Sequence, residues 1–150
     1  MELSYETAQK ADIDLIFQLS RNQVEQYEDT QAIDLEQVLL WVRQKISDHI
    51  NSYTRILYRG QLAGFYRFIP CEEEMELDDF YVLPAFRGMG IGSQVLRRCC
   101  QVHSPIMLYV FTRNCRAIAL YRRFGFQIAE KVGTTRIIMR RVAGLQEEAL

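Results

Sequence analysis

The sequence predicts an α/β (α+β) fold, with helices packed on a mixed β-sheet. Three observations lead to this prediction. The chain has 150 residues, of which 49% are hydrophobic and 25% charged, which suits a single globular domain over residues 1–150. Apolar residues recur at helical spacing in the first third, and short β-branched and aromatic runs follow. The elements then read β-α-α-β-β-β-α-β-α-β-β in order.

The first third of the chain is mainly helical. A short strand is expected at 3–7, a helix over 12–27, and a second helix over 34–50 after a polar, acidic connection at 25–30. Asp34 is the expected N-cap of the second helix. Its apolar residues recur at spacings of three and four, at Leu35, Val38, Leu39, Val42 and Ile46.

The rest of the chain alternates short strands with helices. Strands are expected at 53–58, 62–69, 75–83, 106–111, 126–129 and 135–140, and helices at 92–103 and 116–123. Arg59-Gly60-Gln61 joins the first two of these strands in a hairpin. The run at 106–111 is continuously apolar, which is typical of a buried central strand.

Charge and composition exclude several classes of protein. Residues 1–76 carry a net charge of −7 and residues 77–150 a net charge of +6. This asymmetry suits a site that takes an anion on one side and a cation on the other, or it is uneven scatter over the surface. The overall charge of −1 argues against nucleic-acid binding. Without an apolar run of about 20 residues or a signal peptide, we expect no membrane association and a cytoplasmic location.

The cysteines do not indicate a metal site. Cys71, Cys99, Cys100 and Cys115 form no CxxC pair and have no histidine at ligand spacing. Cys99 and Cys100 are adjacent on a predicted helix, so at least one should face the core. We therefore expect no metal cofactor.

The most informative segment is a glycine-rich loop, Arg87-Gly88-Met89-Gly90-Ile91-Gly92, between a strand and a helix. Glycine tolerates positive φ, successive N–H groups at a helix start bind anions, and Arg87 adds a planar cation. The spacing differs from the GxGxxG of dinucleotide-binding loops, and no lysine follows as in a P-loop. The loop favours pyrophosphate binding; the alternative is a turn that is merely rich in glycine.

Two motifs resemble those of the GNAT acetyltransferase superfamily. Residues 87–92 are similar to its R/Q-x-x-G-x-G/A signature. A second segment is similar to its N-x-x-A-x-x-L-Y-x-x-x-G-F motif, at Asn114, Ala117, Leu120-Tyr121 and Gly125-Phe126. The order of elements resembles the family over essentially the whole chain. The resemblance implies the GNAT fold: a mixed, mostly antiparallel central sheet flanked by helices, with central strands that splay apart beyond Val82.

The resemblance also implies acetyl-CoA as cosubstrate. The pyrophosphate would bind the backbone amides of Arg87, Gly88, Met89, Gly90, Ile91, Gly92 and Ser93. The backbone of Phe80, Tyr81 and Val82 would pair with the pantetheine arm like an added strand. Asn114 would contact the arm, and as an asparagine at a helix start it is also the expected N-cap.

The strand expected at 75–83 changes phase in the middle. Met75 and Leu77 share one phase, Phe80 and Val82 share the other, and Asp78-Asp79 lies between them. A β-bulge produces such a slip and often re-aims side chains beside an active site. The alternative is that both faces of the strand are buried.

The implied activity is N-acetylation of a primary amine by direct transfer in a ternary complex. The amine, with a pKa near ~10.4, must lose a proton before it attacks the thioester. Asp78, Glu76 and Glu74 are candidate bases; Asp78 lines up best with one common family position, and Glu76 lies on the same side. Tyr121 matches the family's acid for the leaving thiolate, and packing of its ring is the alternative role.

The acceptor is less well indicated. In the family, the first two helices and their connection cover the acceptor site, and here this region contains Glu25, Tyr27 and Glu28. Such a surface suits a small cationic amine or a peptide or protein amine, although an ordinary solvated loop has the same composition. A homodimer is one possible assembly. The alternative function is a non-catalytic, acyl-CoA-binding regulatory module.

Overall fold

The computed structural model describes residues 2–144 and divides into two compact units, which we describe separately. The first comprises Met1–Arg67 with Asp79–Leu83, and the second comprises Phe68–Asp78 with Pro84–Leu150. Strands β3 and β4 each contribute to both units. The single domain expected from the sequence stays a prediction.

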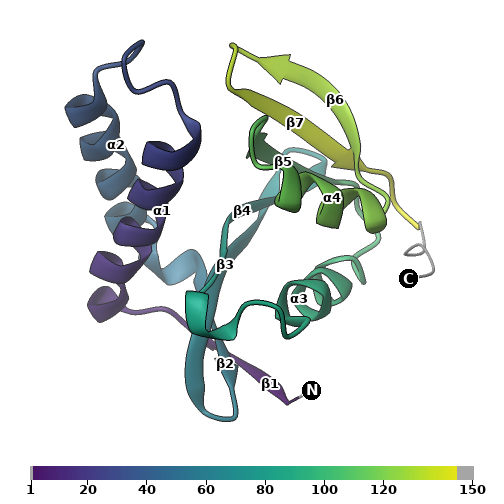
Figure 1. Ribbon diagram of the computed structural model, residues 1–150. Helices are drawn as coiled ribbons and strands as arrows, with labels where there is room; N and C mark the ends of the chain where they lie inside the picture. Colours follow the sequence, from purple (N-terminus) through teal and green to yellow (C-terminus); the bar gives the residue numbers. More distant parts are fainter. Residues whose placement is uncertain (1, 145–150) are drawn as a thin grey trace. The chain divides into compact units, whose positions relative to one another are not determined.

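The first unit pairs two helices with the first strands of the sheet. The helices α1 (Ile13–Tyr27) and α2 (Leu35–Asp48) lie side by side (Figure 1). The strands are β1 (Leu3–Thr7), β2 (Tyr53–Tyr58), most of β3 (Gln61–Cys71) and the end of β4 (Glu74–Val82), with short 3-10 helices at Lys10–Asp12 and Ile50–Ser52.

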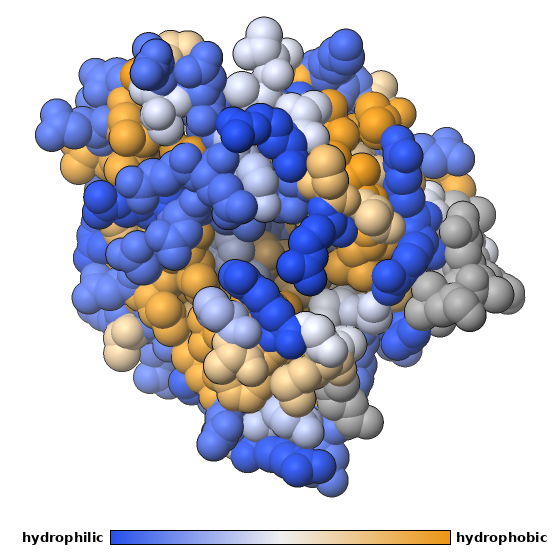
Figure 2. Space-filling model, in the orientation of Figure 1, coloured by the Kyte–Doolittle hydropathy of each residue, from blue (hydrophilic) through white to orange (hydrophobic). Residues whose placement is uncertain are grey.

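Local sequence signals explain these elements. The Asp34 side chain accepts a hydrogen bond from the Gln37 amide at 3.2 Å, so the predicted N-cap of α2 is confirmed. Arg59 and Gly60 both have positive φ, as a two-residue hairpin turn requires, and β2 pairs antiparallel with β3. On the face shown in Figure 2, mostly hydrophilic residues cover α1 and α2.

The second unit contains the remaining helices and strands. They are η3 (Pro84–Phe86), α3 (Ile91–Cys99), β5 (Ile106–Phe111), α4 (Cys115–Arg123), β6 (Gln127–Val132) and β7 (Arg136–Arg141), together with the start of β4. The expected helix over 92–103 ends early. Its last turn tightens into i→i−3 bonds, from the Gln101 amide to the Arg98 carbonyl and from the Val102 amide to the Cys99 carbonyl.

The strands form a seven-stranded sheet in the order β1-β2-β3-β4-β5-β7-β6. The β1–β2, β2–β3, β5–β7 and β6–β7 pairs are antiparallel, and β4 pairs with β5 in parallel. The parallel register pairs Met75 with Ile106 and Glu76 with Met107, at the start of β4. The splay expected beyond Val82 stays a prediction. The mixed, mostly antiparallel sheet confirms the predicted fold class. No helix in residues 2–144 is both long and apolar enough to cross a membrane.

Candidate functional site

The glycine-rich loop lies in the second unit, between η3 and α3. Gly88 and Gly90 have φ of +77° and +83°, a left-handed backbone that L-residues with a Cβ rarely adopt, and Gly90 is the N-cap of α3. A Cβ at position 88 would meet nothing within 4 Å, so a ligand can approach the backbone there. The first hydrogen bond within α3 runs from the Gln94 amide to the Gly90 carbonyl. The amides of the first helical turn, before Gln94, therefore have no carbonyl partner within the helix. This arrangement fits an anion.

The helix behind the loop is anchored on its apolar face. The buried residues of α3 are Ile91, Val95, Leu96 and Cys99. Arg123 on α4 donates a hydrogen bond to the Ser93 hydroxyl at 3.1 Å, and the Arg97 guanidinium lies 5.8 Å from the ring centre of Phe124. These contacts fix the helix N-terminus in the second unit.

Helix α4 places the residues of the second motif. The Asn114 side chain accepts a hydrogen bond from the Ala117 amide at 3.3 Å, which confirms the predicted cap. Tyr121 is buried, with 9% of its surface exposed, and its ring centre lies 5.7 Å from that of Phe126. Burial, and then the nearby Cys99, raise the pKa of Tyr121 well above its ordinary value. The phenol is therefore protonated throughout the physiological pH range.

The acidic residues of β4 have different surroundings. Glu74 accepts two hydrogen bonds from the Arg140 guanidinium, at 3.2 and 3.4 Å, which commits its carboxylate to a forked ion pair. Glu76 and Asp78 are half-buried and lie two residues apart, one on each side of the buried Leu77. All three candidate bases are thus half-buried on β4.

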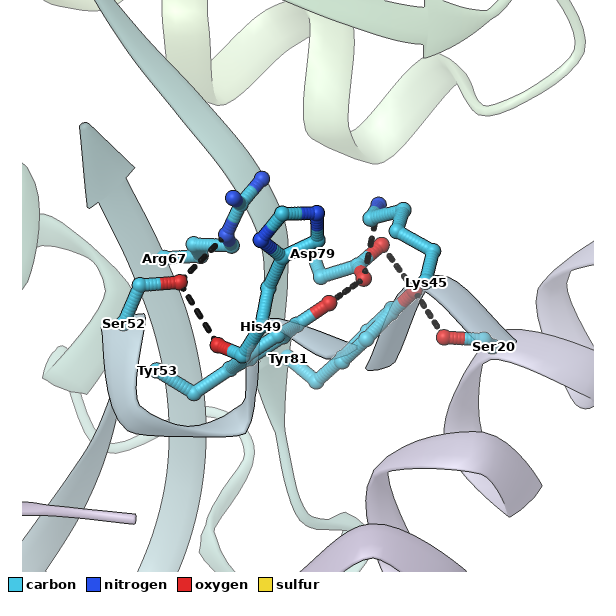
Figure 3. Close-up of polar contacts among 8 residues, drawn as sticks. All are labelled: Ser20, Lys45, His49, Ser52, Tyr53, Arg67, Asp79 and Tyr81. Atoms are coloured by element: carbon cyan, nitrogen blue, oxygen red, sulfur yellow. Dashed lines mark hydrogen bonds and ion pairs between the residues drawn. The ribbon is translucent and has the colours of Figure 1, made fainter. Parts of the chain in front are cut away.

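The phase change in β4 falls at Asp79, a residue that sequence analysis treated only as a spacer. Its φ is +46°, a left-handed backbone inside a strand, as expected for a bulge. Its carboxylate accepts hydrogen bonds from Lys45 Nζ at 3.1 Å, Tyr53 Oη at 2.5 Å and Tyr81 Oη at 3.0 Å (Figure 3). With this left-handed backbone, the Asp79 side chain meets donors from α2, β2 and β4.

The same polar network extends to both sides of Asp79. Tyr81 Oη shares a hydrogen bond of 2.9 Å with the hydroxyl of Ser20, which is only 4% exposed. On the other side, Arg67 Nε donates to the Ser52 hydroxyl at 2.6 Å, and its guanidinium lies 5.8 Å from the ring centre of Tyr53. Both helices of the first unit and its strands β2, β3 and β4 thus contribute to this cluster.

One sequence signal could have revealed the cluster. Lys45 lies three residues after Val42 and seven after Val38, so it occupies the apolar stripe of α2. A cation in such a stripe needs a buried partner, and the acidic pair at the phase slip supplies one.

The acidic region proposed for the acceptor is mainly helical. Glu25 and Tyr27 belong to α1, and Glu28 is its C-cap. The Glu25 carboxylate pairs with Arg21 at 3.2 Å, and Glu28 accepts a hydrogen bond from the Asp29 amide at 3.2 Å. Part of the expected negative charge is thus offset by the chain's own groups.

The predicted site residues fall into two groups. The second unit contains the glycine loop, Asn114, Tyr121, Glu76 and Asp78, and the first contains 80–82 with the acidic end of α1. Over residues 2–144, no group of three His, Cys, Asp or Glu side chains could hold a metal ion.

Comparison with known proteins gives consistent results. The model of the "Acetyltransferase (GNAT) family" matches residues 14–126. The spermine/spermidine N(1)-acetyltransferase of Bacillus subtilis is 34% identical over 86 residues, which cover 48% of this chain and 57% of the relative. The thialysine N-epsilon-acetyltransferase of Bos taurus is 39% identical over 56 residues, covering 34% of this chain and 33% of the relative. These matches therefore span little more than half of each curated relative, or less.

Solved structures share the fold. The PaiA N-acetyltransferase of Thermoplasma acidophilum, determined in complex with coenzyme A, superposes with a TM-score of 0.73 at 16% identity, over 95% of this chain and 99% of that chain. The Ard1 protein of Thermoplasma volcanium gives a TM-score of 0.69 at 18% identity, over 95% and 99% of the two chains. Since the family model covers residues 14–126, which is most of the chain, this protein belongs to the acetyltransferase (GNAT) family.

Proposed function

We propose that the protein transfers an acetyl group from acetyl-CoA to a primary amine, directly, within a ternary complex. The observation that carries this proposal is the glycine loop. Gly88 and Gly90, both with positive φ, precede α3, and the first amides of this helix have no carbonyl partner within it. The space beside Gly88 is open. Backbone N–H groups arranged in this way suit the pyrophosphate of coenzyme A.

Other residues would hold the rest of the cosubstrate. On one side, the Leu83 amide donates to the Ala63 carbonyl of β3 at 2.7 Å. The opposite edge of Phe80–Val82 would pair with the pantetheine arm. Asn114, whose amide oxygen caps α4, would present its NH₂ group to the arm. When bound, acetyl-CoA supplies the acyl group activated as a thioester.

The chain's own groups would move the protons. Asp78 or Glu76 would accept the proton of the acceptor ammonium, and the Tyr121 hydroxyl would protonate the departing thiolate. The raised pKa of Tyr121 keeps that proton in place before the reaction.

The amine acceptor is supported by the relatives, which by name acetylate spermine, spermidine and thialysine. We assign it to the end of α1, where Glu25, Tyr27 and Glu28 lie. A small cationic amine is the favoured class, and a peptide or protein amine is the second.

The test combines a panel of amines with a matched pair of glycine variants. Wild-type protein should release thiol from acetyl-CoA when a suitable amine is present. Gly88→Ala should weaken acetyl-CoA binding about tenfold or more in calorimetry, since its methyl group points into the ligand's space.

Gly60→Ala is the control. Gly60 has φ of +78° and nothing within 4 Å, so both variants carry the same backbone strain, but Gly60 lies in the β2–β3 turn. Equal acetyl-CoA affinity in all three proteins would refute the site. Tight binding without turnover of any amine would instead support the non-catalytic acyl-CoA-binding module.

A further inference from the structure

Asp79 has an unusual backbone conformation for its place in the fold. Three residues other than glycine have positive φ in residues 2–144, and two of them, Arg59 and Glu72, lie in turns between strands. Asp79, with φ of +46°, lies within β4 instead. A residue with a Cβ keeps such a conformation only where its surroundings hold it there. The contacts of the Asp79 side chain therefore have a structural task beyond ordinary strand pairing.

Both oxygens of the Asp79 carboxylate accept hydrogen bonds. Oδ2 accepts from Lys45 Nζ at 3.1 Å and from Tyr53 Oη at 2.5 Å, and Oδ1 accepts from Tyr81 Oη at 3.0 Å (Figure 3). Only 15% of the Asp79 side chain and 1% of Tyr53 are exposed. Hydrogen bonds to a charged group are stronger than those between neutral groups. The carboxylate therefore ties this left-handed residue to α2 and β2.

Asp79 is also the residue at which β4 enters the first compact unit. That unit takes in Asp79–Leu83, whereas the preceding residues of β4 belong to the second unit. At the other end of this segment, the Leu83 amide donates to the Ala63 carbonyl of β3 at 2.7 Å. The two ends of the segment are thus fixed to the first unit, one by an ionic cluster and the other by a backbone hydrogen bond. Between them lies Phe80–Val82, the segment proposed to pair with the pantetheine arm.

We propose that Asp79 is a positioning residue for the cosubstrate. Its ion pair with Lys45 and its bonds from the two tyrosines hold Phe80–Val82 in the backbone conformation that pairs with the pantetheine arm. Such pairing needs several backbone groups in register at once. If the segment sampled other conformations, its affinity for the arm would fall in proportion to the fraction of time spent in the competent one. This inference rests on the proposed function and adds to it a residue that acts through the backbone of its neighbours.

The test separates the two parts of the cosubstrate. Acetyl-CoA carries both the pyrophosphate and the pantetheine arm, whereas 3′-phospho-ADP, the nucleotide part of coenzyme A, carries the pyrophosphate without the arm. Asp79→Asn removes the charge but keeps the size of the side chain and a residue type that tolerates positive φ. It should weaken acetyl-CoA binding about tenfold in calorimetry, as expected if the competent conformation falls to about a tenth of the population. Binding of 3′-phospho-ADP should stay unchanged, whereas Gly88→Ala should weaken both ligands.

Matched variants identify the cause of the change. Asp14→Asn makes the same chemical change at an exposed carboxylate that also pairs with a cation of α2, Arg43, and it should leave both affinities unchanged. Lys45→Met removes the cation of the cluster and should show the same selective loss as Asp79→Asn. Tyr53→Phe removes one donor and keeps the ring, and it takes the place of either variant that does not fold by circular dichroism. The inference is overturned if acetyl-CoA affinity is unchanged in the folded cluster variants, or if it falls together with that for 3′-phospho-ADP.

Amide hydrogen exchange, measured without ligand, separates this inference from the proposed function. Relative to the Ile56 amide of β2 in the same unit, the Leu83 amide should exchange faster in Asp79→Asn than in wild type or Asp14→Asn, because the segment opens more often. If wild type binds neither ligand, the proposed function fails; faster exchange at Leu83 in Asp79→Asn then still supports the anchoring, and unchanged exchange refutes it. If wild type binds acetyl-CoA and acetylates an amine, but Asp79→Asn alters neither exchange nor affinity, the proposed function stands and the inference fails.

Discussion

Among single residues, Tyr121 best illustrates two roles for one side chain. Its ring packs on Phe126 in the core of the second unit, and its hydroxyl has a strongly raised pKa because burial disfavours the phenolate. Packing requires only the ring, whereas protonation of a leaving thiolate requires the hydroxyl. The two roles can therefore be separated by removing one atom.

Tyr121→Phe should lower kcat by about 10²–10⁴ while leaving acetyl-CoA affinity nearly unchanged. Thiol release measures the rate and calorimetry the affinity. Tyr109→Phe, on the exposed side of β5 with 46% of the residue accessible, is the matched control and should leave both unchanged. Full activity of Tyr121→Phe would assign the residue to packing alone.

The two carboxylates of β4 can be distinguished by pH. Asp78→Asn should lower kcat/KM at neutral pH and recover part of it at high pH, where the amine is already neutral. Glu76→Gln should show a smaller loss. The comparison is made by measuring kcat/KM as a function of pH for each protein, with one active amine as the acceptor. Identical profiles for both variants and wild type would mean that neither carboxylate is the base.

At the scale of elements, β3 and β4 approach each other unusually closely at Gly64. A Cβ built at this position would lie under 3.0 Å from the Tyr81 carbonyl oxygen, closer than real Cβ contacts, and 3.1 Å from Val82 Cα. Both neighbours are backbone atoms that cannot swing aside. Glycine at 64 therefore sets the separation of the two strands beside the segment assigned to pantetheine.

Gly64→Ala should lower the free energy of unfolding by about 1–3 kcal/mol, because the strands must move apart. Urea denaturation measures this change. Lower acetyl-CoA affinity should accompany it if Phe80–Val82 holds the cosubstrate. If Gly64→Ala had the same free energy of unfolding and the same acetyl-CoA affinity as wild type, β4 would move aside for the added methyl group at no energetic cost.

Helix α3 carries a pH-sensitive core residue. Cys99 is 2% exposed, and burial, followed by the adjacent Cys100, raises its pKa to about 12, from 9.0 for an ordinary thiol. Above pH 9 the unfolded chain loses this proton while the folded protein keeps it. Stability should therefore fall as pH rises from 9 toward 12.

From pH 8 to pH 10, wild-type protein should lose about 1.4 kcal/mol more stability than Cys99→Ala, the effect of one proton bound only in the folded state. Urea titrations at both pH values provide the measurement. Cys115→Ala, at an exposed cysteine, is the control and should follow wild type. If Cys99→Ala and wild type lost the same amount of stability between the two pH values, the Cys99 thiol would ionise equally in the folded and unfolded states.

At the scale of the whole molecule, the open question is whether the two compact units unfold together. The sequence predicts one domain, for which equilibrium unfolding is cooperative. Amide hydrogen exchange can test this at buried positions, such as Ile56 in β2 of the first unit and Leu108 in β5 of the second. In one cooperative domain, these amides should show the same opening free energy and the same dependence on denaturant. Two distinct values would identify two independently unfolding units.

The sequence by itself determined the order of elements, the family and the residue types of the glycine loop. These depend on local rules: apolar spacing specifies helices and strands, Asp34 and Asn114 act as caps through bonds to nearby amides, and glycine permits the positive φ at 88 and 90. Such interactions involve residues close in the chain. They could therefore be read directly from the order of residues.

The Asp79 cluster was decided only by the tertiary structure. Lys45, Tyr53 and Tyr81 reach this carboxylate from three elements, and the left-handed backbone at Asp79 directs it toward them. The two bonds from Lys45 and Tyr53 join residues 34 and 26 positions apart, and neither spacing is a property of any one helix or strand. The sequence could show that a strand slips phase at Asp78-Asp79. Which side chains then gather around the displaced carboxylate depends on how helices and strands pack, because partners so distant in the chain meet only when the core forms.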